Sequence, residues 1–220
     1  MEYIRGKTSA EIDADGLAAR VAGYDDVLID VGTGDGRYVL HVARTQPTCF
    51  AIGVDACWNN LRRASRKVPP NVLYVIANAL ALPAELGGMA SKVTINFPWG
   101  SLLTGLVDGE PMLLEGLLAI TRAGAALEVR LNGGALAESG YTLETGTARV
   151  RRALQERGFD VGELLWLDAR ELRQCHTTWA KRLAYDRDPR RAPEGNARES
   201  CHFRGASKLP RSDPAPWRGL

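Results

Sequence analysis

The stretch VLIDVGTGDG, residues 27–36, decides which fold this sequence is expected to adopt. Its first five residues are apolar except for Asp30, and a short run of this kind that ends in glycines is typical of a buried parallel strand. Gly32, Gly34 and Gly36 allow a tight turn, and a ligand can approach such a turn without meeting a Cβ atom. Residues 38–43 then have helical periodicity. The stretch therefore predicts a strand–turn–helix unit that holds a ligand at the start of the helix.

The spacing of the glycines indicates which ligand. A dinucleotide-binding turn, G-x-G-x-x-G, would place its third glycine at position 37, where this sequence has Arg37. Asp30 disfavours a phosphate at the end of the strand but suits a ligand that carries an ammonium group. S-adenosylmethionine (SAM) carries both an ammonium and a sulfonium, and Asp55, after the next strand, is placed to bind the two hydroxyls of a ribose. We therefore expect a SAM site with Asp30, Gly32, Gly34 and Asp55 as contacts.

The remainder of the chain alternates strands and helices, which is typical of a doubly wound α/β sheet. We expect an α/β fold of the class I SAM-dependent methyltransferase (Rossmann-like) type, with about seven mostly parallel strands and a C-terminal antiparallel hairpin. The expected parallel strands are 27–31, 50–54, 72–76, 93–97 and 126–130, and the expected helices are 38–43, 58–67, 112–121 and 147–157. Strands near 161–167 and 177–183 form the expected closing hairpin. Segment 77–80, after the third strand, is then expected to line the adenine of the cofactor. The alternative is that these residues only pack against the rest of the protein.

Composition changes mark the expected domain boundary. Residues 1–185 form the methyltransferase domain, in which residues 1–20 include an N-terminal hairpin with Gly6 and Lys7 at its turn. A glycine-containing stretch, 132–145, is expected to be a linker. From Asp186 onward, proline, glycine and arginine are frequent and apolar periodicity disappears. Residues 186–220 are therefore expected to form a basic, flexible tail that orders only on a partner.

Several classes of protein are not indicated by the composition. No segment approaches the ~20 apolar residues that span a bilayer, and the N-terminus lacks a secretory apolar region, so we expect a cytoplasmic protein without a membrane partner. We expect it to be a monomer. The four cysteines lie far apart in the sequence and form no C-x-x-C pair, which indicates neither a metal site nor a disulfide framework.

Positive charge is clustered even though the formal net charge is only +2. One cluster contains Arg62, Arg63, Arg66 and Lys67, and a second, within 181–191, contains Lys181, Arg182, Arg187, Arg190 and Arg191. Two local clusters on a nearly neutral chain are typical of a protein that binds a polyanion such as RNA. The alternative is that both clusters are ordinary solvated surfaces.

Two tryptophans are placed to present flat aromatic surfaces. Trp99 follows the fourth strand in the loop Asn96–Ser101, and ligands of parallel α/β sheets lie at the carboxyl ends of the strands. Trp179 lies late in the chain, in Thr177-Thr178-Trp179. If both rings reach one cleft, they sandwich a flipped nucleobase; the alternative for either ring is core packing.

These motifs together resemble a known family. DVGTGDG (30–36), PWGSLL (98–103) and TW followed by KRL (178–183) are similar to the aminoglycoside-resistance 16S rRNA (adenine-1408-N1)-methyltransferases of the KamB/NpmA type. The resemblance covers about residues 1–190. The glycine turn is found in many methyltransferases, whereas the PWGSLL loop combined with the late TW segment is more specific.

The resemblance implies roles for individual residues. Trp99 and Trp179 match the tryptophans that stack the flipped adenine, and Ser101 matches a small hydroxyl residue near the cofactor. Ala79 and Leu80 fall in the cofactor-binding segment, but Leu80 stands where the family has an acidic residue. A further basic position of the family falls on Pro189. The positions that match rRNA contacts are Arg62, Arg63, Arg66, Lys67, Thr178, Arg182 and Arg187.

The resemblance thus implies methyl transfer from SAM to N1 of adenine 1408 in 16S rRNA of the assembled 30S subunit, with resistance to aminoglycosides as the consequence. Two RNA-directed alternatives remain open at this point. Asn96-Phe97-Pro98 is also similar to the strand-four loop of tRNA (guanine-N7)-methyltransferases, and a SAM-type fold can survive in a non-catalytic RNA-binding protein. A small-molecule methyltransferase is disfavoured by the basic clusters.

Overall fold

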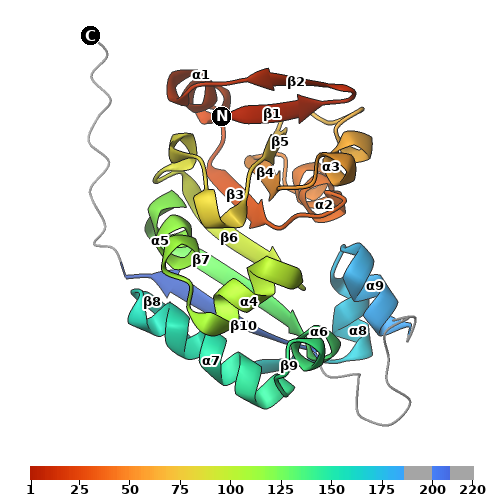
Figure 1. Cartoon of the computed structure of the whole chain (residues 1–220). Helices are drawn as coiled ribbons and strands as arrows, with labels where there is room; N and C mark the ends of the chain where they lie inside the picture. The colour runs from red at the N-terminus through yellow and green to blue at the C-terminus, as the bar shows by residue number, and fades with distance from the viewer. Residues whose placement is uncertain (186–199, 209–220) are drawn as a thin grey trace.

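The structure is a computed structural model of the chain, and it describes residues 1–185 and 200–208 (Figure 1). In this part of the chain a single mixed sheet of ten strands runs through the molecule. Helices cover both of its faces (Figure 1). None of the helices in the described segments is long and apolar enough to cross a membrane.

Five parallel strands form the centre of the sheet, in the order β5-β4-β3-β6-β7. The residues of β3, β4 and β5 are mostly apolar and buried, as expected of strands that are covered on both faces. The strands β6 and β7 also carry charged residues, namely Lys92, Glu128 and Arg130 among others. The chain order reverses at β3, which lies between β4 and β6, and this is the position at which α/β sheets bind ligands. The strands are β3 (Asp26–Val31), β4 (Cys49–Asp55), β5 (Val72–Ile76), β6 (Ala90–Asn96) and β7 (Thr121–Asn132).

Two apolar clusters pack on opposite faces of this sheet. The larger cluster joins one face to five helices, namely α1 (Ala14–Val21), α4 (Gly100–Asp108), α5 (Pro111–Ile120), α6 (Gly133–Glu138) and α7 (Leu143–Glu156). The smaller cluster joins the other face to α2 (Arg37–Thr45) and α3 (Trp58–Ala64). Short 3-10 turns, η1 (Ala79–Ala81) and η2 (Ala84–Leu86), connect β5 to β6.

The expected closing hairpin, formed by strands near 161–167 and 177–183, is not found in the structure. The first segment is divided into β8 (Phe159–Val161) and β9 (Leu165–Leu167), and the second is not a strand. Residues 178–184 form helix α9 (Thr178–Ala184), which follows α8 (Ala169–Gln174). The Thr177 hydroxyl accepts a hydrogen bond from the Ala180 N–H, and this N-cap starts a helix in a segment whose threonines and tryptophan favour strands.

The antiparallel strand at the end of the sheet comes instead from the segment expected to be a tail. β10 (Ser200–Ser207) inserts between β7 and β8 and also pairs with β9, antiparallel to all three. The boundary expected at residue 185 is therefore wrong for residues 200–207, where Cys201 and Phe203 are buried in the core. Residues 186–199 and 209–220, the other parts of the expected tail, lie outside the described residues.

The N-terminal residues form a hairpin of β1 (Glu2–Arg5) and β2 (Thr8–Glu11), with Gly6 at φ 68° in its turn. β1 extends the sheet beyond β5 through a Tyr3–Val75 pair. The expected linker 132–145 is partly helical, because Asn132 caps α6 and Thr142 caps α7. Helices α1 and α4 were not expected from the sequence.

Candidate active site

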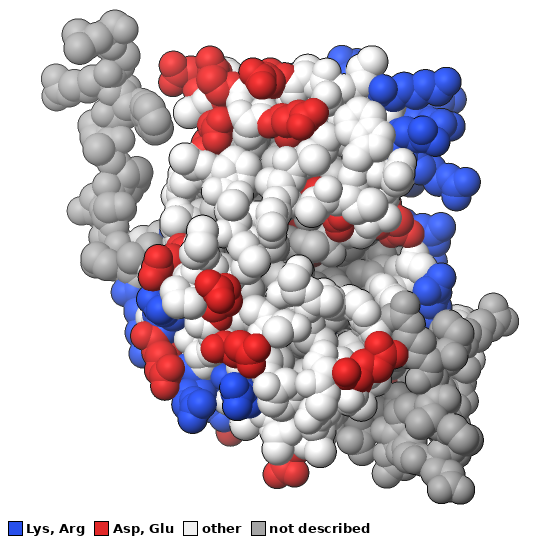
Figure 2. Space-filling model, viewed as in Figure 1, with Lys and Arg blue, Asp and Glu red and all other residues white. Residues whose placement is uncertain are grey.

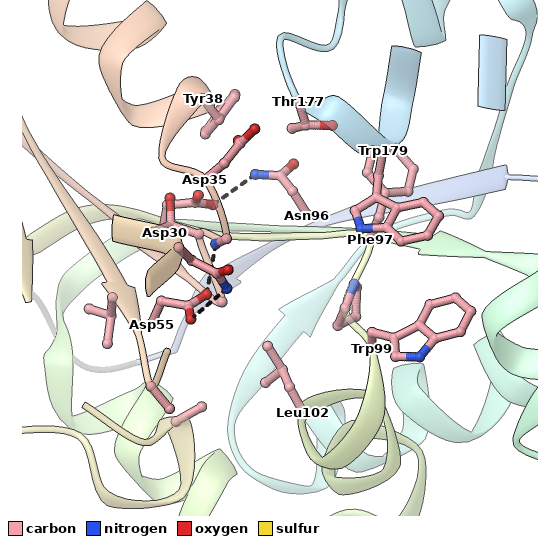
Figure 3. A pocket seen from close by; sticks show the side chains of 18 of the residues that line it. Asp30, Asp35, Tyr38, Asp55, Asn96, Phe97, Trp99, Leu102, Thr177 and Trp179 are labelled. Carbon is pink, nitrogen blue, oxygen red and sulfur yellow. Dashed lines mark hydrogen bonds between the residues drawn. The ribbon is translucent and has the colours of Figure 1, made fainter. Parts of the chain in front are cut away.

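A cavity of about 470 Å³ lies at the carboxyl ends of β3, β4, β5 and β6 (Figure 3). The glycine turn after β3 forms one side, and the loop 96–102 with the start of α9 forms the other. Most of the residues proposed from the sequence as cofactor or base contacts line this single cavity: Asp30, Gly32, Gly34, Asp55, Ala79, Trp99, Ser101, Thr178, Trp179 and Arg182. The fold thus brings together residues from five distant segments of the chain.

The first two glycines of the turn are required by its backbone. Gly32 and Gly34 have φ values of 73° and 57°, which residues with a Cβ atom rarely adopt. A Cβ atom on Gly32 would lie 2.5 Å from a methyl group of Leu102, whereas Gly34 has no atom within 4 Å of that position. The Gly34 backbone is therefore open to a ligand on its cavity side.

The third glycine has a packing role that explains its unusual spacing. Gly36 is the N-cap of α2, with φ 69°. A Cβ atom there would lie 2.5 Å from the ring of Tyr74, whose hydroxyl donates a 2.7 Å hydrogen bond to the Gly36 carbonyl. Because Tyr74 is fully buried, its ring cannot move aside. The turn is thus fixed to β5.

Asp30 is the buried anion of the cavity. Its Oδ1 accepts hydrogen bonds from the hydroxyl of Thr94 (2.7 Å) and the amide of Asn96 (2.8 Å). Burial raises the pKa of this carboxyl, although the hydroxyls of Thr33 and Thr94 and the Asn96 amide oppose the rise. A buried carboxylate at the wall of a cavity lacks the solvation of water, and a cationic ligand compensates for that loss.

Asp55 is held in one orientation at the end of β4. Its Oδ2 accepts the Gly34 N–H at 2.8 Å, and its Oδ1 accepts the Cys57 N–H at 2.8 Å and the Asn60 amide at 3.3 Å. Each carboxylate oxygen has two acceptor sites, so Oδ2 of Asp55 can still accept one hydrogen bond from a hydroxyl group in the cavity. Its link to Gly34 joins the turn after β3 to the end of β4.

The segment after β5 contributes less than expected. Ala77, Asn78 and Ala79 line the cavity, but Leu80 does not. The 3-10 turn directs the Leu80 side chain into the apolar core, where it approaches Gly105 of α4. The sequence-based placement of Leu80 at the cofactor is therefore not supported by the structure. Ser101 lines the cavity from the first turn of α4.

The loop after β6 is strained where it enters the cavity. Phe97 has φ 52°, an uncommon value for a residue with a side chain. Its N–H donates to the Arg130 carbonyl at 2.8 Å, and its side chain is buried against Leu172 and Ala180 of α8 and α9. With Phe97 anchored in this way, Pro98 and Trp99 line the cavity. Strain that is retained at such a site is typical of a functional loop.

Trp99 and Trp179 face each other across the cavity (Figure 3). Their ring centroids lie 5.4 Å apart and the ring planes differ by 5°. The guanidinium of Arg182, one turn further along α9, lies 5.1 Å from the Trp179 ring centroid. Parallel aromatic rings of this kind provide flat surfaces on which a planar group can stack.

Helix α9 is attached to the cofactor side by contacts from neighbouring residues. The Thr178 hydroxyl donates to Oδ2 of Asp35 in the glycine turn at 2.6 Å. Just before α9, the ring of His176 stacks on that of His41 in α2, with 3.4 Å between the centroids. Burial and the neighbouring His176 lower the pKa of His41, which favours the neutral form of the His41 ring. The position of Trp179 therefore depends on the glycine turn and α2.

The predicted RNA-binding residues of segment 62–67 do not line the cavity. Arg62 and Arg63 lie on α3, Arg66 and Lys67 follow it, and all four side chains are exposed. Arg187 lies outside the described residues. Within the described ranges no group of three histidine, cysteine or acidic side chains is arranged to hold a metal ion.

A polar network that was not predicted from the sequence lies behind the cavity and is centred on Arg130 of β7. Its Nη1 donates to Oδ1 of Asn96 at 2.6 Å, and its Nη2 pairs with Glu128 at 2.8 Å. Tyr38 of α2 lines the cavity and lies with its ring centroid 5.9 Å from the Arg130 guanidinium. The sequence did contain a sign of this network. Residues 128 and 130 carry opposite charges in a strand expected to be buried, and alternate residues of a strand share a face.

Comparisons with known proteins identify the family to which the chain belongs. The family model for the 16S rRNA (adenine(1408)-N(1))-methyltransferase NpmA matches residues 2–194. A curated relative of the same description, from Streptoalloteichus hindustanus, is 35% identical over 181 residues, which cover 75% of this chain and 83% of the relative.

Solved structures show the same fold. A mutant 16S rRNA (adenine(1408)-N(1))-methyltransferase from Catenulisporales acidiphilia, crystallised with its cosubstrate SAM, is 29% identical and covers 98% of this chain and 100% of its own, with a TM-score of 0.78. The aminoglycoside resistance methyltransferase NpmB1 is 31% identical and covers 94% of this chain and 98% of its own, with a TM-score of 0.74. The glycine turn, the facing tryptophans and these matches together place the chain in the 16S rRNA (adenine(1408)-N(1))-methyltransferase family.

Proposed function

We propose that this protein transfers a methyl group from SAM to N1 of adenine 1408 in 16S rRNA of the assembled 30S subunit and thereby confers aminoglycoside resistance. The observation that supports the proposal most directly is the pair of parallel tryptophans, Trp99 and Trp179, at the cavity that contains the buried Asp30. The family assignment favours the small-subunit substrate over tRNA. The site of action is then the bacterial cytoplasm, where we expect the enzyme to act as a monomer.

The cavity residues suit SAM in charge and in shape. Asp30 provides a carboxylate for the ammonium group, and Oδ2 of Asp55 provides an acceptor for a ribose hydroxyl. The open Gly34 backbone admits the cofactor, and Ala79 leaves room for the adenine. Ser101 adds a hydroxyl-bearing side chain to the lining of the cavity.

The reaction requires no general base. Bound SAM supplies an electrophilic methyl group, which adenine N1 attacks in line with its lone pair while the sulfonium sulfur leaves as a thioether. The adenine becomes cationic, and the rings of Trp99 and Trp179 stabilise this charge by about 0.5–2 kcal/mol per ring. The chain's main contribution is to position N1 against the methyl group, which supplies several kcal/mol through effective concentration.

The base must open the tryptophan pair before it enters. A base stacked between two rings needs about 7 Å, twice the stacking distance of about 3.4 Å, whereas the ring centroids lie 5.4 Å apart. The two rings therefore have to separate before a base enters, and an outward movement of Trp179 together with α9 would stretch the Thr178–Asp35 hydrogen bond. Stacking at about 1–3 kcal/mol per ring offsets the few kcal/mol that flipping the base costs.

The exposed cations of residues 62–67 provide a docking surface for the rRNA backbone. In Figure 2, Lys and Arg side chains gather at the upper right, over the region of α3 and the tip of the β1–β2 hairpin. A second cavity, of about 290 Å³, lies there between the hairpin and the segment after α3. Its cationic lining residues are Arg5, Arg20, Arg66 and Lys67, and its lining contains no carboxylate. Such a surface recognises folded rRNA by charge and shape.

Primer extension on 16S rRNA, after incubation of 30S subunits with the protein and SAM, tests the activity. Methylation of N1 blocks base pairing, so reverse transcription stops beside adenine 1408. The Trp179→Ala variant is expected to retain SAM binding and to lose most of the stop, since one ring contributes about 1–3 kcal/mol of stacking. Trp166→Ala is the matched control, because Trp166 lies exposed on β9, outside the cavity. Unchanged methylation by Trp179→Ala would refute the two-tryptophan arrangement.

Binding of 30S subunits at several salt concentrations tests the docking surface. The double variant Arg66→Glu/Lys67→Glu is expected to bind more weakly and with a lower salt dependence, by about 0.7–0.9 in the log–log slope per lost phosphate contact. Arg151→Glu/Arg152→Glu makes the same change of charge on exposed positions of α7. Equal effects of the two double variants would assign residues 62–67 to an ordinary solvated surface.

A further inference from the structure

The orientation of the Asn96 amide is determined by its neighbours. Its Nδ2 donates to the Asp30 carboxylate at 2.8 Å, and its Oδ1 accepts from Nη1 of Arg130 at 2.6 Å. A guanidinium has donors only and an ionised carboxylate has acceptors only. If the amide were turned over, oxygen would face oxygen and nitrogen would face nitrogen. Arg130 therefore allows only the orientation in which Asn96 donates to Asp30.

Arg130 is itself held by buried charges. Its Nη2 lies 2.8 Å from Oε2 of Glu128, and the other oxygen of Glu128 lies 3.0 Å from Nζ of Lys92. The Arg130 and Glu128 side chains are only 13% and 8% exposed. In such surroundings charged hydrogen bonds are stronger than on a surface, and their geometry is better defined. The chain Asp30–Asn96–Arg130–Glu128 is thus a continuous series of hydrogen bonds from the cavity wall into the sheet.

Other titratable groups face this series from neighbouring elements. They are Tyr38 of α2, Cys175 at the end of α8, and His202 and Arg204 of β10. Burial raises the pKa values of Tyr38 and Cys175 and lowers that of His202. These three side chains are therefore uncharged near neutral pH, and Arg204 is largely exposed. Arg130 is the buried cation nearest to Asp30 among the described residues that contact this series.

We propose that Arg130 is a positioning residue for the cofactor: through Asn96 it holds the Asp30 carboxylate in place for the ammonium group of SAM. The inference depends on the proposed role of Asp30 as the partner of that ammonium. The strand β7 contributes no residue to the cavity lining. The proposal nevertheless gives this strand a role in cofactor binding, through Arg130. Because the effect acts through Asp30, it concerns the amino-acid end of the cofactor and not its adenosine.

Two ligands that differ only at that end test the proposal by calorimetry. S-adenosylhomocysteine carries the amino-acid group, and 5′-methylthioadenosine retains the adenosine and the thioether without it. Arg130→Gln is expected to weaken S-adenosylhomocysteine binding about tenfold or more, the worth of a charge-assisted hydrogen bond. Binding of methylthioadenosine is expected to change by no more than about twofold. Arg130→Lys, which keeps the charge but not the planar fork, should lie between wild type and Arg130→Gln.

The pH profile provides a second readout. Asp30 binds an ammonium only when it is ionised, and Arg130 is one of the groups that oppose the raised pKa of Asp30. In Arg130→Gln the loss of S-adenosylhomocysteine affinity on acidification should therefore begin at a higher pH than in wild type. A purely structural role for Arg130 would not move this profile.

Two further variants make the outcomes distinguishable. Arg204→Gln removes a cation that lies 3.4 Å from Glu128, without touching Asn96, and should leave both ligands unaffected. Asp30→Asn should weaken S-adenosylhomocysteine selectively. If it does and Arg130→Gln does not, or if Arg130→Gln weakens both ligands equally, the positioning role is refuted. If Asp30→Asn itself has no selective effect, the proposed role of Asp30 fails, and the role of Arg130 fails with it.

Discussion

Substitution of alanine for Gly36 should destabilise the protein more than the same substitution at Gly34. Both glycines have positive φ, 69° and 57°, and forcing alanine into that region costs about 1–2 kcal/mol. At Gly36 the new methyl group would also lie 2.5–2.7 Å from three atoms of the buried Tyr74. Overpacking of this kind adds about 1–3 kcal/mol. We therefore expect a loss of about 2–5 kcal/mol for Gly36→Ala and about 1–2 kcal/mol for Gly34→Ala.

Urea unfolding of the cofactor-free protein measures this difference. Each variant should lower the midpoint without changing the slope, because the native surface is unchanged. Thermal unfolding should show a shift of about 2–4 °C per kcal/mol for a chain of this size. In a Tyr74→Ala background, the extra cost of Gly36→Ala should fall to the backbone strain alone. Equal costs at the two glycines, or a cost at Gly36 that does not depend on Tyr74, would refute the reasoning.

Three further predictions concern the buried Asp30, the buried His202 and the hydrogen bond between Ser65 and Gly6. The Asp30→Asn variant should be at least as stable as wild type in the absence of cofactor, because burial raises the pKa of Asp30 and makes its ionised form costly. Thermal unfolding at pH 7.5 measures this stability, and a large loss would contradict the expectation. Burial lowers the pKa of His202 below 6.5, so the unfolded state takes up the proton first and stability should fall as pH decreases from about 7 to 5. His202→Phe should reduce that slope in urea titrations, and an unchanged slope would count against it. Ser65→Ala should lower the free energy of unfolding by about 1 kcal/mol, because it removes the acceptor of the 3.0 Å hydrogen bond from the Gly6 N–H. Urea unfolding measures this loss, and a variant as stable as wild type would show that water replaces the hydroxyl.

The central sheet and the cofactor side of the cavity were predictable from local sequence. Apolar runs such as 27–31 and 50–54 form buried strands because their side chains must leave water on both faces of the sheet. Once parallel order is assumed, strand ends meet at one edge, which places Asp30 and Asp55 together. The prediction failed for residues 178–184 because the Thr177 cap and the packing of α8 against α9 outweigh the strand preference of the segment.

β10 shows a second reason for failure. Residues 200–207 lie beyond a stretch rich in proline and arginine, and their local composition gives little sign of a central position in the sheet. The strand is defined by pairing with β7, β8 and β9, which lie 33 or more residues earlier in the sequence. Such long-range pairings leave no periodic pattern in the local sequence, because β10 is buried by the strands that pair with it.

By itself, the sequence determined the glycine turn, the acidic residues at the carboxyl ends of β3 and β4, and the tryptophans of two distant motifs. Those features depend on backbone freedom, charge and residue type, which are local properties. Only the tertiary structure decided that Trp99 and Trp179 lie parallel with 5.4 Å between their centroids. It alone also showed that Gly36 packs on Tyr74 and that Arg130 reaches Asp30 through Asn96. The physical reason is that these distances depend on how strands and helices far apart in the chain pack into one core.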